Sequence, residues 1–195
     1  IGQRALRNLC LSYLAYTEDG NQLVEKQYQQ AGNMTDTIAA MSAANAAQLA
    51  CRETLMQDYS DKWQHDGLVM DKWFLLQGTN PADNALDVIK ASMDHPAFSM
   101  KNPNRIRSLI GSFLNQNPIQ FHDKSGSGYQ FSGQILRELN SSNPQVASRM
   151  VDPLLKLGRY DSDRQAMLKV ELEKLMSLDN LAKDLFEKIS KALDA

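Results

Sequence analysis

The sequence is poor in cysteine, in long apolar runs and in excess positive charge, and each absence excludes a class of protein. Two cysteines in 195 residues are too few for a disulfide framework, so we expect a reducing, cytoplasmic location. No apolar run approaches the roughly 18 residues of a membrane span, so we expect no membrane partner. The formal net charge is −2, with Lys and Arg scattered among Asp and Glu, which argues against a nucleic-acid partner because phosphate contacts need clustered basic side chains.

Motifs for catalysis are missing as well. A zinc peptidase of the thermolysin type needs His-Glu-x-x-His on one helix, and no His-Glu pair occurs in this sequence. The three histidines, His65, His95 and His122, are 30 and 27 residues apart, which is no metal-ligand spacing. No Gly-x-Ser-x-Gly, phosphate loop or dinucleotide fingerprint is present. We therefore expect no catalytic residue, no metal ligand and no cofactor in this chain.

The sequence does contain helical periodicity almost throughout, with no convincing alternating strand. The pairs Asn102-Pro103 and Asn143-Pro144 each combine a capping side chain with a proline that suits the first helical position. They lie 41 residues apart, close to the roughly 40–47-residue period of two-helix solenoid repeats. We predict an all-α superhelical stack of antiparallel helix pairs, an α-solenoid of the armadillo or HEAT type with about ten or eleven helices.

Individual helices follow from local patterns. Residues 1–16 are expected to form an amphipathic helix that buries one face, made of Leu6, Leu9, Cys10, Tyr13 and Leu14. Helix starts are expected where a short polar side chain precedes a periodic segment, at Asp36, Asn80, Asp161 and Asp179. Pro153 lies inside the helix that opens at Asn143 and should kink it.

The stretch 102–114 is the most informative part of the chain. Its apolar residues recur at helical spacing and form one stripe, made of Ile106, Leu109, Ile110, Phe113 and Leu114. The opposite face is small rather than charged, with Ser108, Gly111 and Ser112, so we expect this helix to be covered on both sides. Arg105 and Arg107 border the stripe, about 160° apart at about 100° per residue. Either each arginine pairs with a local carboxylate, or at least one lines an internal cavity and meets an anionic ligand group.

This stretch and its neighbours also resemble a known family. The matching segments keep the order and approximate spacing of the family and cover residues 65–74, 102–113, 126–129, 143–149 and 158–161. On these segments the chain resembles the C-terminal helical domain of the bacterial aminopeptidase N family, the zinc-dependent alanyl aminopeptidases. The resemblance covers residues 64–195 well and residues 1–60 more loosely.

The resemblance implies that residues 1–195 form a single C-terminal helical domain of a longer aminopeptidase, and a start at Ile1 rather than Met fits a piece of a longer protein. In that family the zinc and the glutamates that bind the N-terminal amine lie in an upstream catalytic domain of the same chain. The implied function is a non-catalytic domain that caps the active site and shapes the cavity for peptide substrates, which lose their N-terminal residues there. The alternative is a free-standing helical-repeat adaptor that binds another protein in its groove.

Positions that match the pattern of this domain supply the site candidates. We expect Arg105 or Arg107 to meet the carboxylate at the far end of a bound peptide, because a guanidinium presents a planar fork matched to a carboxylate. Asn104 and Tyr129 are further candidates for lining the cavity. The resemblance places the catalytic residues of the family in the upstream domain, so no residue of this sequence corresponds to them.

Overall fold

The computed structural model describes residues 2–194, and every regular element in that range is helical, which confirms the predicted all-α class. The chain divides between Ser99 and Met100 into two compact units. None of the described helices combines the length and the apolar character that crossing a membrane requires.

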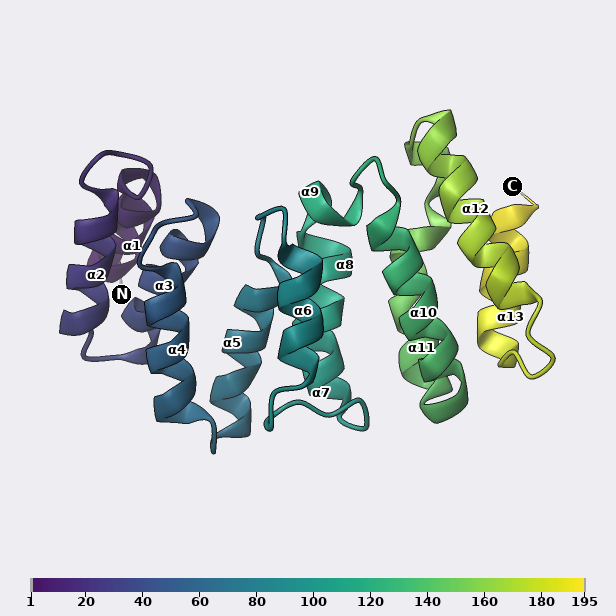
Figure 1. The fold of residues 1–195 in the computed structure, drawn as a ribbon, viewed down its shortest axis with the longest axis horizontal. Helices are drawn as coiled ribbons and strands as arrows, with labels where there is room; N and C mark the ends of the chain where they lie inside the picture. Colours follow the sequence, from purple (N-terminus) through teal and green to yellow (C-terminus); the bar gives the residue numbers. More distant parts are fainter. Residues whose placement is uncertain (1, 195) are drawn as a thin grey trace. The chain divides into compact units, whose positions relative to one another are not determined.

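The first unit consists of helices that pack on their neighbours along the chain (Figure 1). Its elements are α1 (Gly2–Leu14), α2 (Gly20–Gln30), α3 (Met34–Ala46), α4 (Arg52–Trp63), α5 (Gly67–Gly78) and α6 (Ala85–Met93). Helix α3 contacts α1 and α2 on the one hand and α4 and α5 on the other. Contacts limited to the nearest elements along the chain are what a stack of helix pairs requires.

The second unit is built around α10, which contacts α9, α11 and α12, and α13 packs against α11 and α12. Its α-helices are α7 (Pro103–Ile106), α8 (Ser112–Gln116), α9 (Pro118–Phe121), α10 (Ser127–Ser142), α11 (Pro144–Met150), α12 (Ser162–Met176) and α13 (Lys183–Leu193). A π-helical segment, η1 (Arg107–Gly111), joins α7 to α8, and two 3₁₀ turns, η2 (Asp152–Leu155) and η3 (Leu157–Arg159), follow α11. In the described residues, the one-turn helix α9 and the division around η1 account for the α-helices beyond the ten or eleven predicted, and η2 and η3 add two short 3₁₀ turns.

Side-chain caps fix several helix starts as predicted. Asn102, Asn143 and Asp161 each accept a hydrogen bond from a backbone N–H two or three residues ahead, and Pro103 and Pro144 take the first helical positions. These starts depend on residues that are adjacent in sequence, which is why the sequence suffices to place them.

Other predicted starts are wrong. Asn33 caps α3 in place of Asp36, whose carboxylate instead accepts hydrogen bonds from side chains of α1 and from Asn33 itself. Helix α13 begins at Lys183 with no side-chain cap, so Asp179 caps nothing. Asn80 accepts a hydrogen bond from the Ala82 backbone at 3.1 Å, but a turn intervenes before α6 begins at Ala85.

Two apolar helix faces were predicted to be buried, the stripe of residues 106–114 and the face of α1, and only the first is buried. The stripe of residues 106–114 is buried in the second unit, as predicted. Helix α1 has its predicted apolar face exposed, with Leu6 at 62%, Leu9 at 55% and Tyr13 at 73% exposure, and Cys10 and Leu14 also exposed. The face of α1 that meets the unit instead buries Leu11, and its polar side chains bond to Asp36, so the expected inward orientation is wrong.

Candidate functional site

The chain segment of the predicted site contains a π-helical turn. The backbone N–H of Ser112 donates to the carbonyl of Arg107, five residues back, instead of to Ser108. The Ser108 carbonyl, which lacks the Ser112 N–H, accepts a hydrogen bond from the Ser112 hydroxyl at 2.6 Å instead. The same hydroxyl also lies 2.9 Å from Leu109 O. Asn115 Nδ2 likewise donates to Gly111 O at 2.9 Å. Side chains therefore satisfy the carbonyls that the wider turn exposes, and wide turns of this kind are frequent at functional sites.

A cavity of about 300 Å³ lies beside this turn, between η1–α8 and α11 of the second unit. Its walls combine two guanidinium groups with amide and apolar side chains, from Arg107, Gly111, Asn115, Gln116, Val146, Arg149 and Met150. Gly111 faces Met150, whose sulfur lies 3.6 Å from where a β-carbon at residue 111 would be. The small face of the helix is thus covered here by α11, and Ser112 is buried.

The two arginines that line the cavity make it positively charged. Arg107 comes from the first position of η1 and Arg149 from the last turn of α11, and both side chains are exposed. Within residues 2–194, no carboxylate forms an ion pair with either guanidinium. Two like charges in one cavity repel each other, so an anion between them would be favoured.

The other predicted site residues lie elsewhere. Arg105 is buried, at 8% exposure, and is not among the residues that line this cavity. Asn104 is exposed at the start of α7, where its backbone N–H donates to Asn102 Oδ1 at 3.0 Å. Tyr129 is fully buried in the second unit, and its hydroxyl lies 2.7 Å from His122 Nδ1. The arrangement therefore brings Arg107 together with Arg149, which the sequence analysis did not single out.

No set of side chains in the described range is suited to hold zinc. No group of three or more His, Cys, Asp or Glu residues between positions 2 and 194 is arranged to hold a metal ion. His95 Nε2 lies 3.0 Å from Ser60 Oγ, while its Nδ1 accepts a hydrogen bond from the Ala97 backbone. His122 Nδ1 bonds to Tyr129, and His65 is exposed. The donor set does not fit the zinc site of a peptidase.

The Ser60–His95 pair is also unsuited to nucleophilic catalysis. Because Nδ1 of His95 accepts the Ala97 N–H at 3.0 Å, the proton of the neutral ring is on Nε2. Nε2 then donates to Ser60 and cannot take the proton from its hydroxyl, which a general base would have to do. Burial lowers the pKa of His95, which favours this neutral form.

Comparisons with known proteins agree on one group of relatives. The family model described as "Domain of unknown function (DUF3458_C) ARM repeats" matches residues 1–194, and ARM repeats confirm the predicted solenoid class. The chain is 58% identical over 193 residues to Aminopeptidase N of Haemophilus influenzae, 55% over 195 residues to that of Escherichia coli and 37% over 194 residues to that of Caulobacter vibrioides. These matches cover 98–99% of this chain but only 22% of each relative.

A solved structure shows the same fold. The crystal structure of Legionella pneumophila aminopeptidase A in complex with aspartic acid superposes with a TM-score of 0.89 at 29% identity. The match covers 99% of this chain and 23% of that one. The chain therefore spans less than a quarter of the length of the proteins it is similar to.

Proposed function

The chain belongs to the DUF3458_C family of ARM-repeat domains, and we propose that it serves as the non-catalytic helical domain of an aminopeptidase. In this proposal it closes over the active site of the longer chain and shapes the cavity that receives peptides. Its partners are then the catalytic part of the same chain and the peptide substrates. Support comes from relatives named Aminopeptidase N, of which it matches only a part, and from a donor set that does not fit zinc.

The observation that carries a specific role is the cavity shared by Arg107 and Arg149. An aminopeptidase holds the amino end of its substrate at the reacting centre, so a short peptide carries its terminal carboxylate away from that centre. Arg107 and Arg149 offer paired guanidinium forks to this carboxylate, and such charge-assisted hydrogen bonds are stronger than neutral ones. Because the contact is remote from the scissile bond and equal in ground and transition states, it should act on KM more than on kcat.

The test compares Arg107→Ala and Arg149→Ala in the complete aminopeptidase. With peptides of three to six residues, each variant should raise KM by about tenfold, equivalent to about 1.4 kcal/mol, with kcat little changed. Peptides of the same sequence with an amidated C-terminus lack the negative charge and should show no such increase. Arg159→Ala, which removes an exposed arginine outside the cavity, is the matched control.

Two results would contradict this role. Equal KM changes for free and amidated peptides would mean that the arginines act through structure and not through charge. If Arg105→Ala raised KM more than Arg107→Ala and Arg149→Ala, the peptide carboxylate would be bound by the buried Arg105 instead. Hydrolysis of alanyl-chromophore substrates by the 195-residue chain alone, with zinc added, would overturn the assignment as a non-catalytic domain.

The adaptor alternative makes a different prediction. A free-standing adaptor would have no peptidase sequence fused to it, whereas the aminopeptidase proposal requires His-Glu-x-x-His in the reading frame upstream. The lengths of the relatives, more than four times the matched segment, favour the aminopeptidase.

A further inference from the structure

Helix α1 of the first unit presents an apolar surface that nothing among residues 2–99, the described part of that unit, covers. We define the α1 surface as the exposed side chains of Leu6, Leu9, Cys10, Tyr13 and Leu14. Leu6, Cys10 and Leu14 follow one another at intervals of four residues, and Leu9 and Tyr13 form a parallel row beside them. A stripe of this width is what an amphipathic helix normally buries against another helix.

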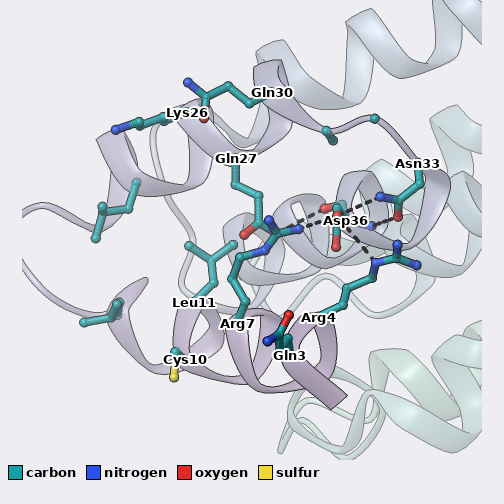
Figure 2. Close-up of a pocket in the computed structure, with 14 residues that line it drawn as sticks. Gln3, Arg4, Arg7, Cys10, Leu11, Lys26, Gln27, Gln30, Asn33 and Asp36 are labelled. Atoms are coloured by element: carbon teal, nitrogen blue, oxygen red, sulfur yellow. Dashed lines mark hydrogen bonds and ion pairs between the residues drawn. The ribbon is translucent and has the colours of Figure 1, made fainter. Parts of the chain in front are cut away.

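A groove adjoins the α1 surface. It has a volume of about 880 Å³ and lies between α1, α2 and the start of α3, within the first unit. Cys10 and Leu14 belong both to the α1 surface and to the groove wall, so the two are continuous. The opposite wall includes Leu23, Lys26 and Gln30 of α2. Figure 2 shows Arg4 and Arg7 reaching from α1 toward Asp36, whereas Lys26 and Gln30 extend from α2 away from Asp36.

The groove has more positive than negative charge. Asp36 is its carboxylate, and Arg7, Asn8 and Asn33 already donate hydrogen bonds to that carboxylate. Arg4 lies 3.8 Å from Asp36 and is half exposed, and Lys26 is exposed with no carboxylate paired to it in the described part of the chain. Arg4 and Lys26 can therefore pair with acidic groups brought in from outside.

Helix α13 of the second unit gives a comparison for the outer face of α1. Helix α13 buries Leu185 and Ile189, and its exposed side chains are four charged residues and Phe186. Helical-repeat proteins need a polar outer face on a terminal repeat. The exposed face of α13 is mostly charged in this way, whereas that of α1 carries an apolar stripe.

We propose that the α1 surface and the basic groove together receive an amphipathic helix of the longer chain, one that carries acidic residues beside its apolar stripe. Its apolar side chains cover Leu6, Leu9 and Tyr13, and its carboxylates meet Arg4 and Lys26. The relatives provide ample chain for this occupant, because the matched segment is only 22% of their length. This docking is independent of the anion-binding role of Arg107 and Arg149.

Cys10 provides a native probe of the docking, because its thiol lies where the two parts of the surface meet. The experiment measures the rate at which N-ethylmaleimide alkylates Cys10 in the full-length aminopeptidase, read by peptide mass spectrometry. Buried Cys51 is the internal reference for global unfolding. We expect Cys10 in the monomeric full-length protein to react at least tenfold more slowly than the same residue in urea.

Two substitutions test the two parts of the proposed contact. Leu9→Glu should raise the alkylation rate of Cys10 at least tenfold, whereas Val170→Glu, at an exposed apolar position of α12, should not. Lys26→Glu should raise the rate more at low salt than at high salt, because it places a negative charge opposite the acidic residues of the docked helix. Lys169→Glu, an exposed lysine outside the groove, is its control.

Several results would overturn the proposal. Rapid alkylation of Cys10 in the intact monomer would show that the surface is bare. Protection that disappears on dilution would show that a second copy, and not the same chain, covers it. An alkylation rate that Lys26→Glu leaves unchanged would contradict the acidic character of the occupant. None of these readouts depends on peptide KM, so the two proposals can fail separately.

Discussion

The carboxylate of Glu171 occupies the space that a β-carbon on Gly133 would need, so α10 and α12 approach closely only because residue 133 has no side chain. Glu171 is only 2% exposed. Its oxygens pair with Lys174 Nζ at 2.7 Å and with Arg137 at 3.4 Å. A buried carboxylate is costly unless it is paired in this way, and the two cations therefore fix where it lies.

Gly133→Ala should destabilise the protein despite the better helix propensity of alanine. Alanine in a helix interior is favoured by about 1 kcal/mol over glycine, but the new methyl group would displace Glu171 from its two cations. We expect a net loss of about 2 kcal/mol in the free energy of unfolding, measured by urea denaturation. In a Glu171→Ala background the same substitution should stabilise by about 1 kcal/mol. Equal destabilisation in both backgrounds would show that the carboxylate is not the obstacle.

The network at Asp36 predicts a shifted titration. The hydrogen bond from the Arg7 guanidinium, followed by that from Asn33, lowers the pKa of Asp36 to about 2. Because this pKa is depressed in the folded state, the stabilisation is present above the ordinary value of about 3.9 and is lost as pH falls through about 2. Arg7→Ala should move the pKa back toward the ordinary value, as followed by carboxyl carbon NMR. Arg4→Ala, whose guanidinium makes only a 3.8 Å contact, should move it less.

His95 predicts a pH dependence of the same sign as Asp36, but at a higher pH. Burial lowers its pKa, and protonation would place an N–H at Nδ1 against the Ala97 N–H that Nδ1 now accepts. The unfolded state therefore binds the proton more readily, so stability is complete above a pH of about 6.5 and falls as pH drops below it. The slope contributed by this group is at most about 1.4 kcal/mol per pH unit.

Urea denaturation between pH 5 and 7.5 measures this slope in the wild type and in His95→Gln. The variant should retain a weaker dependence, because burial and Arg164 also lower the pKa of His122. An identical slope in both proteins would contradict the role of His95.

Local sequence was enough to place much of the fold. Asn102, Asn143 and Asp161 cap helices whose first residues follow them directly, and the 106–114 stripe is buried as its periodicity indicates. Such features depend on contacts within one or two turns. The start of α6 was misplaced because Asn80 forms a local turn with Ala82 in place of a helix cap.

Features that depend on distant contacts could not be read from the sequence. The periodicity of α1 identified its apolar face correctly, but the direction of that face depends on which elements are available to cover it. Tyr129 could have lined a cavity on pattern alone, and its burial against Phe121 and His122 is decided by tertiary packing. Arg149 stands in a segment that carries the family resemblance, and its spacing to Arg107 gives no sign that α11 brings them together.

The wide turn at residues 107–111 has a consequence for which changes of chain length this segment can accept. A turn closed by a bond from Ser112 to Arg107 contains one residue more than an ordinary helical turn, so it amounts to a single-residue insertion whose two flanks stay in phase. Loss of one residue there would close the segment into a regular helix with its flanks still in phase, and the carbonyls that Ser112 and Asn115 now satisfy would return to backbone partners. The wide turn is thus encoded in chain length as much as in the identity of its residues.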